Sequence, residues 1–175
     1  MLQLPVSALQ SLLPPVHLLA YSTLLGTQVF ESFVVVRVAH QALPYESFTT
    51  LQKQLFPTYF RCQSALLFIT AVTLPRYGPL SLFRAGWKIL TPFIVAGAVA
   101  TLNAVYYGPM TSRLMMTKRF QAEMEARRDD GSISEELEKL NRSFKRAHAM
   151  SIHLNAITIV ATLWYGWTLA SHIKF

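Results

Sequence analysis

Polar side chains recur at spacings of three and four in the apolar segment that begins at residue 148 and reads HAMSIHLNAITIVATLWYGW. They are His148, Ser151, Asn155, Thr158, Thr162 and Tyr165. This spacing puts all of them on one side of a helix. Because polar groups in hydrocarbon are costly without partners, we expect this face to point towards other helices or a wet cavity. Such a face either joins helices by hydrogen bonds or admits a ligand, an ion or a proton.

A second polar face is expected in the first apolar segment, 16–38. Its members are His17, Tyr21, Gln28 and Glu31. Glu31 is the only acidic residue in the predicted spans, and a carboxyl group at that depth is neutral, paired with a cation or exposed to water. Arg37 points in a nearly opposite direction, so a cationic partner has to come from another helix or from side chains that reach the interface. We expect Glu31 to lie at the same end as His148.

The candidate site is an intramembrane polar cluster drawn from three segments. Its members are His17, Gln28, Glu31, Asn103, His148, Ser151 and Asn155. Asn103 is expected to meet Asn155 or Gln28. The simplest interpretation is that these side chains satisfy one another across a packed bundle, and the alternative is a functional cavity. We expect no catalytic, cofactor or metal site, because hydrolase, kinase, P-loop and dinucleotide motifs are absent and the two sides of the predicted membrane separate His17 from His148.

Composition places these faces in a membrane protein. Apolar residues make up 52% of the chain and charged residues 14%, against about 25% charged in ordinary soluble domains. Segments long enough to cross a ~30 Å hydrocarbon layer are found at residues 16–38, 57–74, 89–107 and 147–170. The predicted fold is an all-α membrane protein, a four-transmembrane-helix bundle that forms a single transmembrane domain over residues 1–175.

Prolines and glycines mark the predicted ends of these helices. Pro14 and Pro15 are expected to start the first, and the PRYGP turn at 75–79 to end the second. Gly108 and Pro109 are expected to end the third span, which also carries a small-residue face that allows close helix approach. That face consists of Ala96, Ala100 and Ala104.

Two segments between the spans look helical without crossing the membrane. Residues 42–56 predict a short interfacial helix that turns at Pro57 into the second span. Residues 110–146 predict a cytoplasmic helical hairpin, broken by DDGS at 129–132. Ser134 is the expected N-cap of its second helix.

Basic residues set the predicted topology. Twelve Lys and Arg lie in or beside the loops after the first and third spans, and four lie on the opposite side. Both large loops are therefore expected in the cytoplasm and both termini in a lumen or outside. The net charge of +7 suits anionic lipid headgroups better than nucleic acid. Because no targeting peptide stands out, an endomembrane location such as the endoplasmic reticulum is favoured over the mitochondrial inner membrane or the plasma membrane.

Several stretches resemble the transmembrane protein 205-like family over nearly the whole chain. They read HLL…GTQVFESFV, LQKQLFPTYF, LNAVYYGPMT and FKRAHAMSIHLN. The resemblance implies a small four-span membrane protein with no established reaction, cofactor or catalytic residue. We predict a non-enzymatic accessory or stabilising subunit, or a scaffold, that contacts membrane lipids and other membrane-protein subunits or a second copy of itself. The alternative is a small-molecule or ion carrier that uses the polar faces of the first and fourth spans, and a lipid-modifying enzyme comes third.

Overall fold

A computed structural model describes residues 6–74, 86–127 and 134–171, with side chains from residue 11 onwards. Within these ranges the chain forms four long helices. The first consists of α1 (Val6–Val29), the π-helical segment η1 (Phe30–Val35) and α2 (Val36–Ala42). The second is α3 (Tyr45–Val72), the third consists of α5 (Trp87–Leu102), the π-helical segment η3 (Asn103–Tyr107) and α6 (Gly108–Glu125), and the fourth is α7 (Glu135–Ala170).

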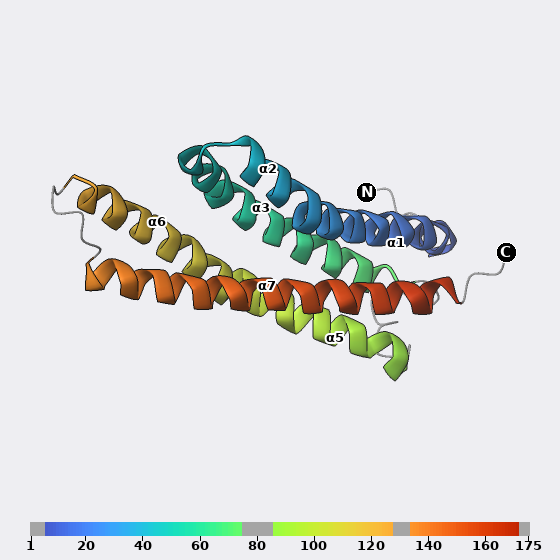
Figure 1. Ribbon diagram of the computed structural model, residues 1–175. Coiled ribbons are helices and arrows are strands. Elements are labelled where there is room, and N and C mark those ends of the chain that lie inside the picture. Colours follow the sequence, from blue (N-terminus) through green and yellow to red (C-terminus); the bar gives the residue numbers. More distant parts are fainter. Residues whose placement is uncertain (1–5, 75–85, 128–133, 172–175) are drawn as a thin grey trace.

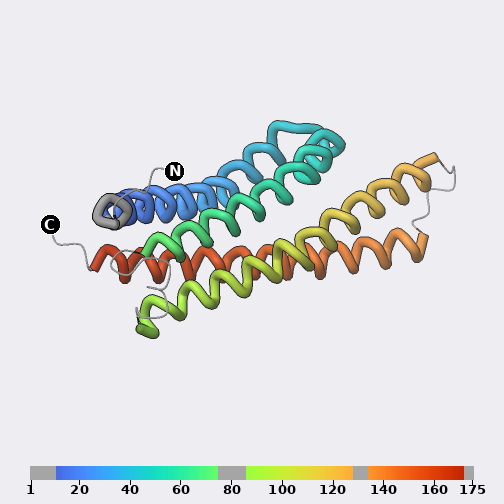
Figure 2. Tube along the Cα trace, turned by 180° about the vertical axis from the view of Figure 1, so that it is seen from behind, coloured from blue at the N-terminus to red at the C-terminus, as the bar shows by residue number. Residues whose placement is uncertain are grey.

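The four long helices run antiparallel along one axis in two layers, α1–α2 with α3 and α5–α6 with α7 (Figure 1). The end at which α6 stops and α7 begins, called the hairpin end below, also holds the turn from α2 to α3. The start of α1, the end of α3, the start of α5 and the end of α7 meet at the opposite end. The view from behind gives the same arrangement (Figure 2).

Several prolines that were predicted to mark helix ends or turns lie inside the helices. Pro14 and Pro15 are within α1, so the predicted helix start at these residues is wrong. Pro57 is within α3, which runs unbroken through 28 residues, so the predicted short interfacial helix over 42–56 is the first part of this longer helix. Proline keeps a helix-compatible φ and removes one backbone donor, a loss that the tertiary contacts of a long helix offset.

The predicted stop at Gly108 and Pro109 is also wrong, because the helix continues through η3 into α6. The backbone N–H of Gly108 donates to the carbonyl of Asn103, five residues earlier, and not to the usual fourth residue. This wider turn lies directly before Pro109 and leaves room for its ring beside the preceding carbonyls. The same type of turn occurs in the first helix, where the N–H of Val36 donates to the carbonyl of Glu31.

The predicted helical hairpin is present as two helices that pack side by side. The first, α6, ends at Glu125, and α7 begins at Glu135. Ser134 is the N-cap, as expected, and its Oγ accepts from the N–H of Leu137 at 3.1 Å. The Oγ of Ser134 also donates to Glu125, so one serine caps α7 and joins it to α6. The predicted PRYGP turn and DDGS break lie outside the described residues.

By length and composition, two stretches are able to cross a membrane, Ser11–Ala42 and Trp87–Glu125. Only 22% and 28% of the residues in their most apolar windows are buried, which is unlike the core helix of a soluble protein. The helices α3 and α7 do not meet the same test. The described structure therefore has four helices, of which two qualify as membrane spans.

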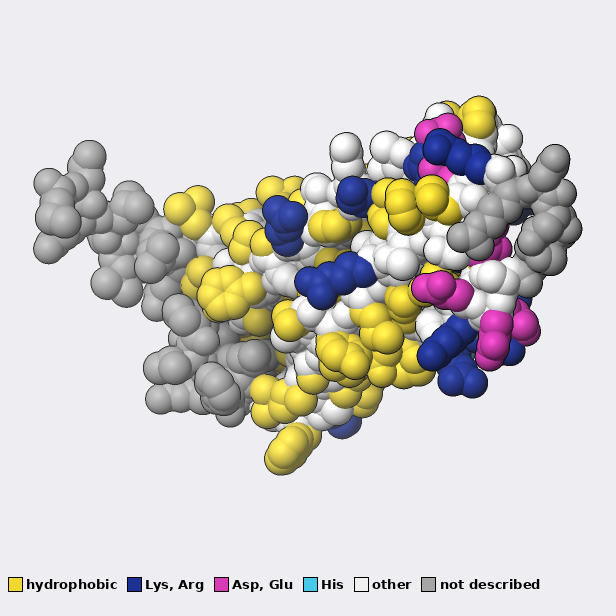
Figure 3. Space-filling view, turned by 90° about the vertical axis from the view of Figure 1, so that its left-hand side faces the viewer, with side chains coloured by type: hydrophobic (Ala, Val, Ile, Leu, Met, Phe, Trp, Pro, Cys, Tyr) yellow, Lys and Arg dark blue, Asp and Glu magenta, His cyan; other side chains and the backbone are white. Residues whose placement is uncertain are grey.

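Large apolar side chains cover the outside of these helices. Phe33, Phe68 and Val105 are each more than half exposed and come from three different long helices. In Figure 3 hydrophobic side chains spread over the middle of the described surface, whereas acidic side chains gather at one side of the view. Lys and Arg side chains lie among the hydrophobic ones as well as beside the acidic ones in this view. A surface with many large exposed apolar side chains is one that a lipid environment favours.

The helices pack around a hydrophobic cluster in the half of the bundle away from the hairpin end. It consists of Leu24, Leu67, Leu74, Phe93, Ala96, Ala100, Ala161 and Tyr165. Ala96 and Ala100 are almost completely buried, and Ala104 is half-buried. The small-residue face predicted for close approach is thus used inside the chain, where α5 packs on α7.

Candidate functional site

A cavity of about 200 Å³ lies between all four long helices, on the hairpin side of the hydrophobic cluster. Its walls combine aromatic and aliphatic side chains with a few polar groups, which is the usual composition of a ligand pocket. The polar groups are Glu31, Ser32, Tyr59, Thr111, Ser112, His148, Ser151 and Asn155, and the other lining residues are Val36, Phe56, Phe60, Gly108 and Ile152.

Glu31 is the acidic residue of the cavity wall. Its side chain is only 7% exposed, and its Oε1 atom has no hydrogen-bond partner among the described residues. The hydroxyl of Thr111, on the facing helix, also lacks a partner there. The cavity lining contains no Lys or Arg that could neutralise the carboxylate. A buried acidic oxygen without a protein partner costs free energy.

Both π-helical segments lie at this cavity, one in its wall and one directly beside it. The segment η1 carries Glu31 and Ser32 into the wall, and η3 ends directly before Gly108, which lines the other side. A π-helical turn adds one residue to the helix and rotates the side chains that follow it. Such turns are frequent at functional sites. Sequence periodicity assumes a regular helix, so it gave no sign of either turn.

Asn155 joins three helices beside the cavity. Its Oδ1 accepts from the hydroxyl of Tyr59 at 2.7 Å and from Nε2 of Gln63 at 3.2 Å, both in α3. Its Nδ2 donates to Oγ of Ser32, in η1, at 2.8 Å. Asn155 was predicted from the sequence, whereas Tyr59, Gln63 and Ser32 were missed. Tyr59 and Gln63 are four residues apart, a spacing that puts two side chains on the same face of a helix. This spacing could have identified them, although the other polar residues of the helix form no clear pattern.

Asn103 pairs with Ser151, and not with Asn155 or Gln28 as predicted. The Nδ2 of Asn103 donates to the backbone carbonyl of Ser151 at 3.0 Å, and Oγ of Ser151 donates back to Oδ1 of Asn103 at 2.8 Å. The hydroxyl of Ser151 is therefore directed to an amide and not to His148, whose ring stacks on Phe144 at a centroid distance of 5.3 Å. Ser151 and His148 therefore do not form a nucleophile–base pair.

The predicted polar cluster divides into two groups. Glu31, His148, Ser151 and Asn155 line the cavity, and Asn103 contacts Ser151. His17 lies elsewhere, where its Nε2 is 2.5 Å from the hydroxyl of Tyr165 and its Nδ1 is 3.3 Å from Oγ1 of Thr73. Members of the hydrophobic cluster lie between the cavity residues and the contacts of His17. Examples are Leu24 on α1 and Leu67 on α3.

Gln28 is completely buried, and both polar atoms of its amide lack a partner among the described residues. The face predicted for the first helix is therefore buried as expected, but its members do not satisfy one another. Glu31 and His148 share the cavity, as their predicted position at one end requires. Among the described residues, no three His, Cys, Asp or Glu side chains gather as metal ligands.

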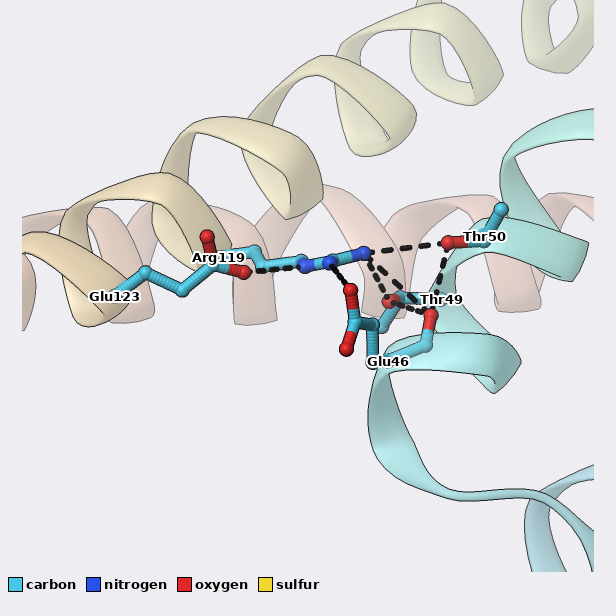
Figure 4. Close-up of polar contacts among 5 residues, drawn as sticks. All are labelled: Glu46, Thr49, Thr50, Arg119 and Glu123. Atoms are coloured by element: carbon cyan, nitrogen blue, oxygen red, sulfur yellow. Dashed lines mark hydrogen bonds and ion pairs between the residues drawn. The ribbon is translucent and has the colours of Figure 1, made fainter.

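An arginine connects the third helix to the start of α3 at the hairpin end (Figure 4). Arg119 lies two turns beyond the cavity on α6, and its guanidinium binds Glu46 at 2.5 Å and Glu123 at 2.7 Å. It also donates to the hydroxyls of Thr49 and Thr50 at 3.4 and 3.2 Å. These contacts set the spacing of α3 and α6 at the hairpin end, next to the cavity walls that the same helices supply.

Residues 19–119 match the family described as Domain of unknown function (DUF4149). The chain belongs to this family. It is 43% identical to Xanthocillin biosynthesis cluster protein D of Aspergillus fumigatus over 91% of this chain and 90% of the relative. It is 32% identical to Transmembrane protein 205 of Danio rerio over 57% of this chain and 54% of that relative. No solved structure matches the chain.

The comparisons confirm the predicted resemblance to the transmembrane protein 205-like family. Together with the two apolar helices, they support a membrane protein. The DUF4149 match contains Glu31 and both π-helical segments, whereas α7 and its cavity residues lie beyond it. The family description names no reaction, so the site has to be interpreted from its own chemistry.

Proposed function

We propose that this chain is a polytopic membrane protein that binds a small molecule in the cavity between its four helices, without catalysing a reaction. The observation that carries the proposal is the carboxyl group of Glu31, which lines the cavity with Oε1 unpartnered and the side chain more than nine-tenths buried. A ligand with a hydrogen-bond donor or a positive charge would satisfy this group.

Neighbouring contacts support a ligand over simple helix packing. Asn103 and Asn155 have partners on other helices, as residues that only join helices should. Glu31 and Thr111 differ, because both line the cavity and both keep an unpartnered oxygen. Interhelical polar contacts contribute about 0.6 kcal/mol each on average, which is too little to offset a buried carboxylate without a partner.

The cavity lies close to the molecular surface on one side. Ile152, on its wall, is 54% exposed. The hydrophobic cluster lies on its other side. This arrangement favours the small-molecule carrier predicted from the sequence, with polar faces of the first and fourth helices in one wall. A relative named for a biosynthesis cluster favours a small organic ligand over an inorganic ion.

The accessory-subunit function stays a prediction. The prediction of an accessory subunit rested partly on a small-residue face that allows close helix packing. Ala96 and Ala100 of this face are buried within the chain, so they are not available to a partner helix. No other feature of the described surface selects a protein partner.

We also propose that all four helices cross the membrane with the hairpin end in the cytoplasm. This topology follows from the twelve basic residues in or beside the two loops at that end, against four at the other. Because α3 and α7 bury several of their polar side chains, among them Gln52, Gln63 and Thr158, each is able to cross as part of a bundle although its mean hydropathy is low. An endomembrane location remains the favoured prediction.

Cysteine protection tests the binding function directly. In a Cys62→Ser background, Thr111→Cys places a thiol in the cavity without removing a hydrogen bond. The protein would be reconstituted in lipid nanodiscs and alkylated with N-ethylmaleimide, with and without the neutral probe 2-phenylethanol. We expect the probe to slow alkylation of the cavity thiol. The matched control is a thiol at Thr158, which is buried outside the cavity and should barely react.

Two results would overturn the proposed function. One is a thiol at residue 111 that reacts no faster than the thiol at residue 158, which would mean that no solute enters the cavity. The other is an alkylation rate that 2-phenylethanol leaves unchanged. Alkylation of the exposed native Cys62 in the wild-type protein measures any general effect of the probe on the membrane or the reagent.

A further inference from the structure

We infer that the ligand of the cavity is an amphipathic amine, a molecule that carries one protonated nitrogen on an apolar substituent. This inference rests on the proposed binding function and specifies its ligand class. It follows from the charge of the cavity wall, from the side chains around Glu31 and from the apolar part of the wall that reaches the outer surface.

The charge of the wall selects a cation. Glu31 is the acidic group of the lining, and no Lys or Arg lines the cavity. The other titratable lining residues are Tyr59 and His148, neither of which carries a negative charge at neutral pH in its ordinary state. An anionic ligand would be repelled by Glu31 and would find no cationic group in the lining. A protonated amine supplies both the missing positive charge and N–H donors for the unpartnered Oε1.

The side chains around Glu31 suit an organic ammonium better than a bare metal ion. Phe56, Tyr59 and Phe60 contribute aromatic rings to the same cavity, with Phe56 and Phe60 stacked at a centroid distance of 6.1 Å. Ring faces attract ammonium groups and also accept apolar substituents. A metal ion would require several oxygen or nitrogen ligands around one point, and no group of three His, Cys, Asp or Glu side chains among the described residues provides them.

The hydroxyls of the wall complete the site for the N–H donors of an ammonium group. Thr111 has an unpartnered hydroxyl oxygen, and Ser112 lines the cavity beside it. An ammonium held by Glu31 has two further N–H donors, and these facing hydroxyls are able to accept them. Among the described residues, the unpartnered oxygen atoms that line the cavity, Oε1 of Glu31 and Oγ1 of Thr111, are thus able to accept N–H donors of one amine head group.

The apolar part of the wall accounts for the apolar substituent. Val36 of α2 and Ile152 of α7 line the cavity, and Ile152 is more than half exposed on the outer surface. A ligand whose nitrogen lies at Glu31 would extend its apolar part along these side chains towards the lipid-facing surface. The inferred binding mode therefore places the cation at Glu31 and the hydrocarbon beside Val36 and Ile152.

Two probes of nearly equal shape test the ligand class. 2-Phenylethylamine and 2-phenylethanol differ in one ammonium or hydroxyl group, and the amine is protonated at pH 7.4 because alkylammonium groups lose a proton only near pH ~10. Both would be titrated in the Thr111→Cys, Cys62→Ser protein, which loses the Thr111 hydroxyl but keeps Glu31 and Ser112 in the cavity wall. The concentration that halves the alkylation rate would be measured. We expect the amine to protect at a concentration about tenfold lower than the alcohol, because only the amine forms a charge-assisted hydrogen bond to Glu31.

Glu31→Gln supplies the decisive comparison. The glutamine side chain keeps the size of Glu31 and removes its charge, so the preference for the amine should disappear while 2-phenylethanol protects as before. Protection by the alcohol also shows that the variant is folded with its cavity intact. If this variant fails to fold, Glu31→Asp, which keeps the charge, should retain the preference and takes its place.

The outcomes separate this inference from the proposed function. Equal protection by both probes in the protein with Glu31 overturns the amine class and leaves the binding function standing. An amine preference that survives Glu31→Gln also overturns the inference, because the charge would then not be the recognition element. Protection by neither probe overturns the binding function and this inference together.

Discussion

Replacing Asn155 with leucine tests how much one polar side chain contributes to the association of three helices. Leucine has a similar volume, and the change removes the hydrogen bonds to Tyr59, Gln63 and Ser32. At about 0.6 kcal/mol for each interhelical contact in a membrane protein, the loss amounts to roughly 2 kcal/mol. For a chain of this size, a change of 1 kcal/mol moves the Tm by about 2–4 °C, so we expect a fall of about 4–8 °C.

The measurement is thermal unfolding in lipid nanodiscs, followed by circular dichroism. Ala156→Leu is the matched control, since it adds the same side chain at the next, exposed position of α7 and should leave the Tm unchanged. A double-mutant cycle with Tyr59→Phe measures the coupling between Tyr59 and Asn155. Removal of the phenol hydroxyl should cost about 0.6 kcal/mol less in the Asn155→Leu protein than in the wild type, because the hydrogen bond from Nε2 of Gln63 to the phenol oxygen is lost in both.

The reasoning would be refuted by an Asn155→Leu protein that is as stable as the wild type or more stable. Buried polar networks are sometimes replaced by apolar side chains with a gain in stability. That result would mean that apolar packing alone fixes the position of α7 against η1 and α3. The hydrogen bonds of Asn155 would then serve to shape the cavity wall, and alkylation of the cavity thiol would be the property that changes.

Three further predictions concern a helical turn, a helix N-cap and an ion pair between helices. Gly108→Ala should destabilise the protein by about 1–3 kcal/mol, because a Cβ there would lie 2.9 Å from the carbonyl oxygen of Asn103. Gly97→Ala is the control in the same unfolding assay, since a Cβ at residue 97 meets nothing within 4 Å. Ser134→Ala should cost about 1 kcal/mol through loss of the N-cap, and unchanged stability would show that the α6–α7 connection does not depend on it. Glu46→Gln should lower the Tm at low salt but not at about 1 M salt, where the exposed ion pair is screened.

Local patterns in the sequence gave the helices and their inner faces. The spacing of Ser151, Thr158, Thr162 and Tyr165 predicted a buried stripe, and all of them are buried in α7. The N-cap at Ser134 was also predictable, since a cap depends on a residue and the turn that follows it. Such features need no knowledge of the neighbouring helices.

The breaks predicted at prolines show where local rules failed. Pro57 and Pro109 have the signature of helix ends, yet both lie inside long helices. A rule based on neighbouring residues considers only the backbone N–H that proline lacks and the steric clash of its ring with the preceding turn. In the folded protein, contacts along the whole helix outweigh that loss, and at Pro109 the wide turn of η3 also relieves the crowding. Neither contribution is encoded within a few residues of the proline.

The sequence by itself determined that this chain forms apolar helices with polar inner faces, because hydrophobic periodicity is a property of each helix alone. Which polar groups meet was decided by the tertiary structure. The spacing of the helices and their relative position along the bundle axis bring Asn103 next to Ser151. The hydrophobic cluster separates His17 from the residues of the cavity. Only the assembled bundle leaves Oε1 of Glu31 in a cavity with no partner among the described residues, since satisfaction of a buried group depends on every helix that surrounds it.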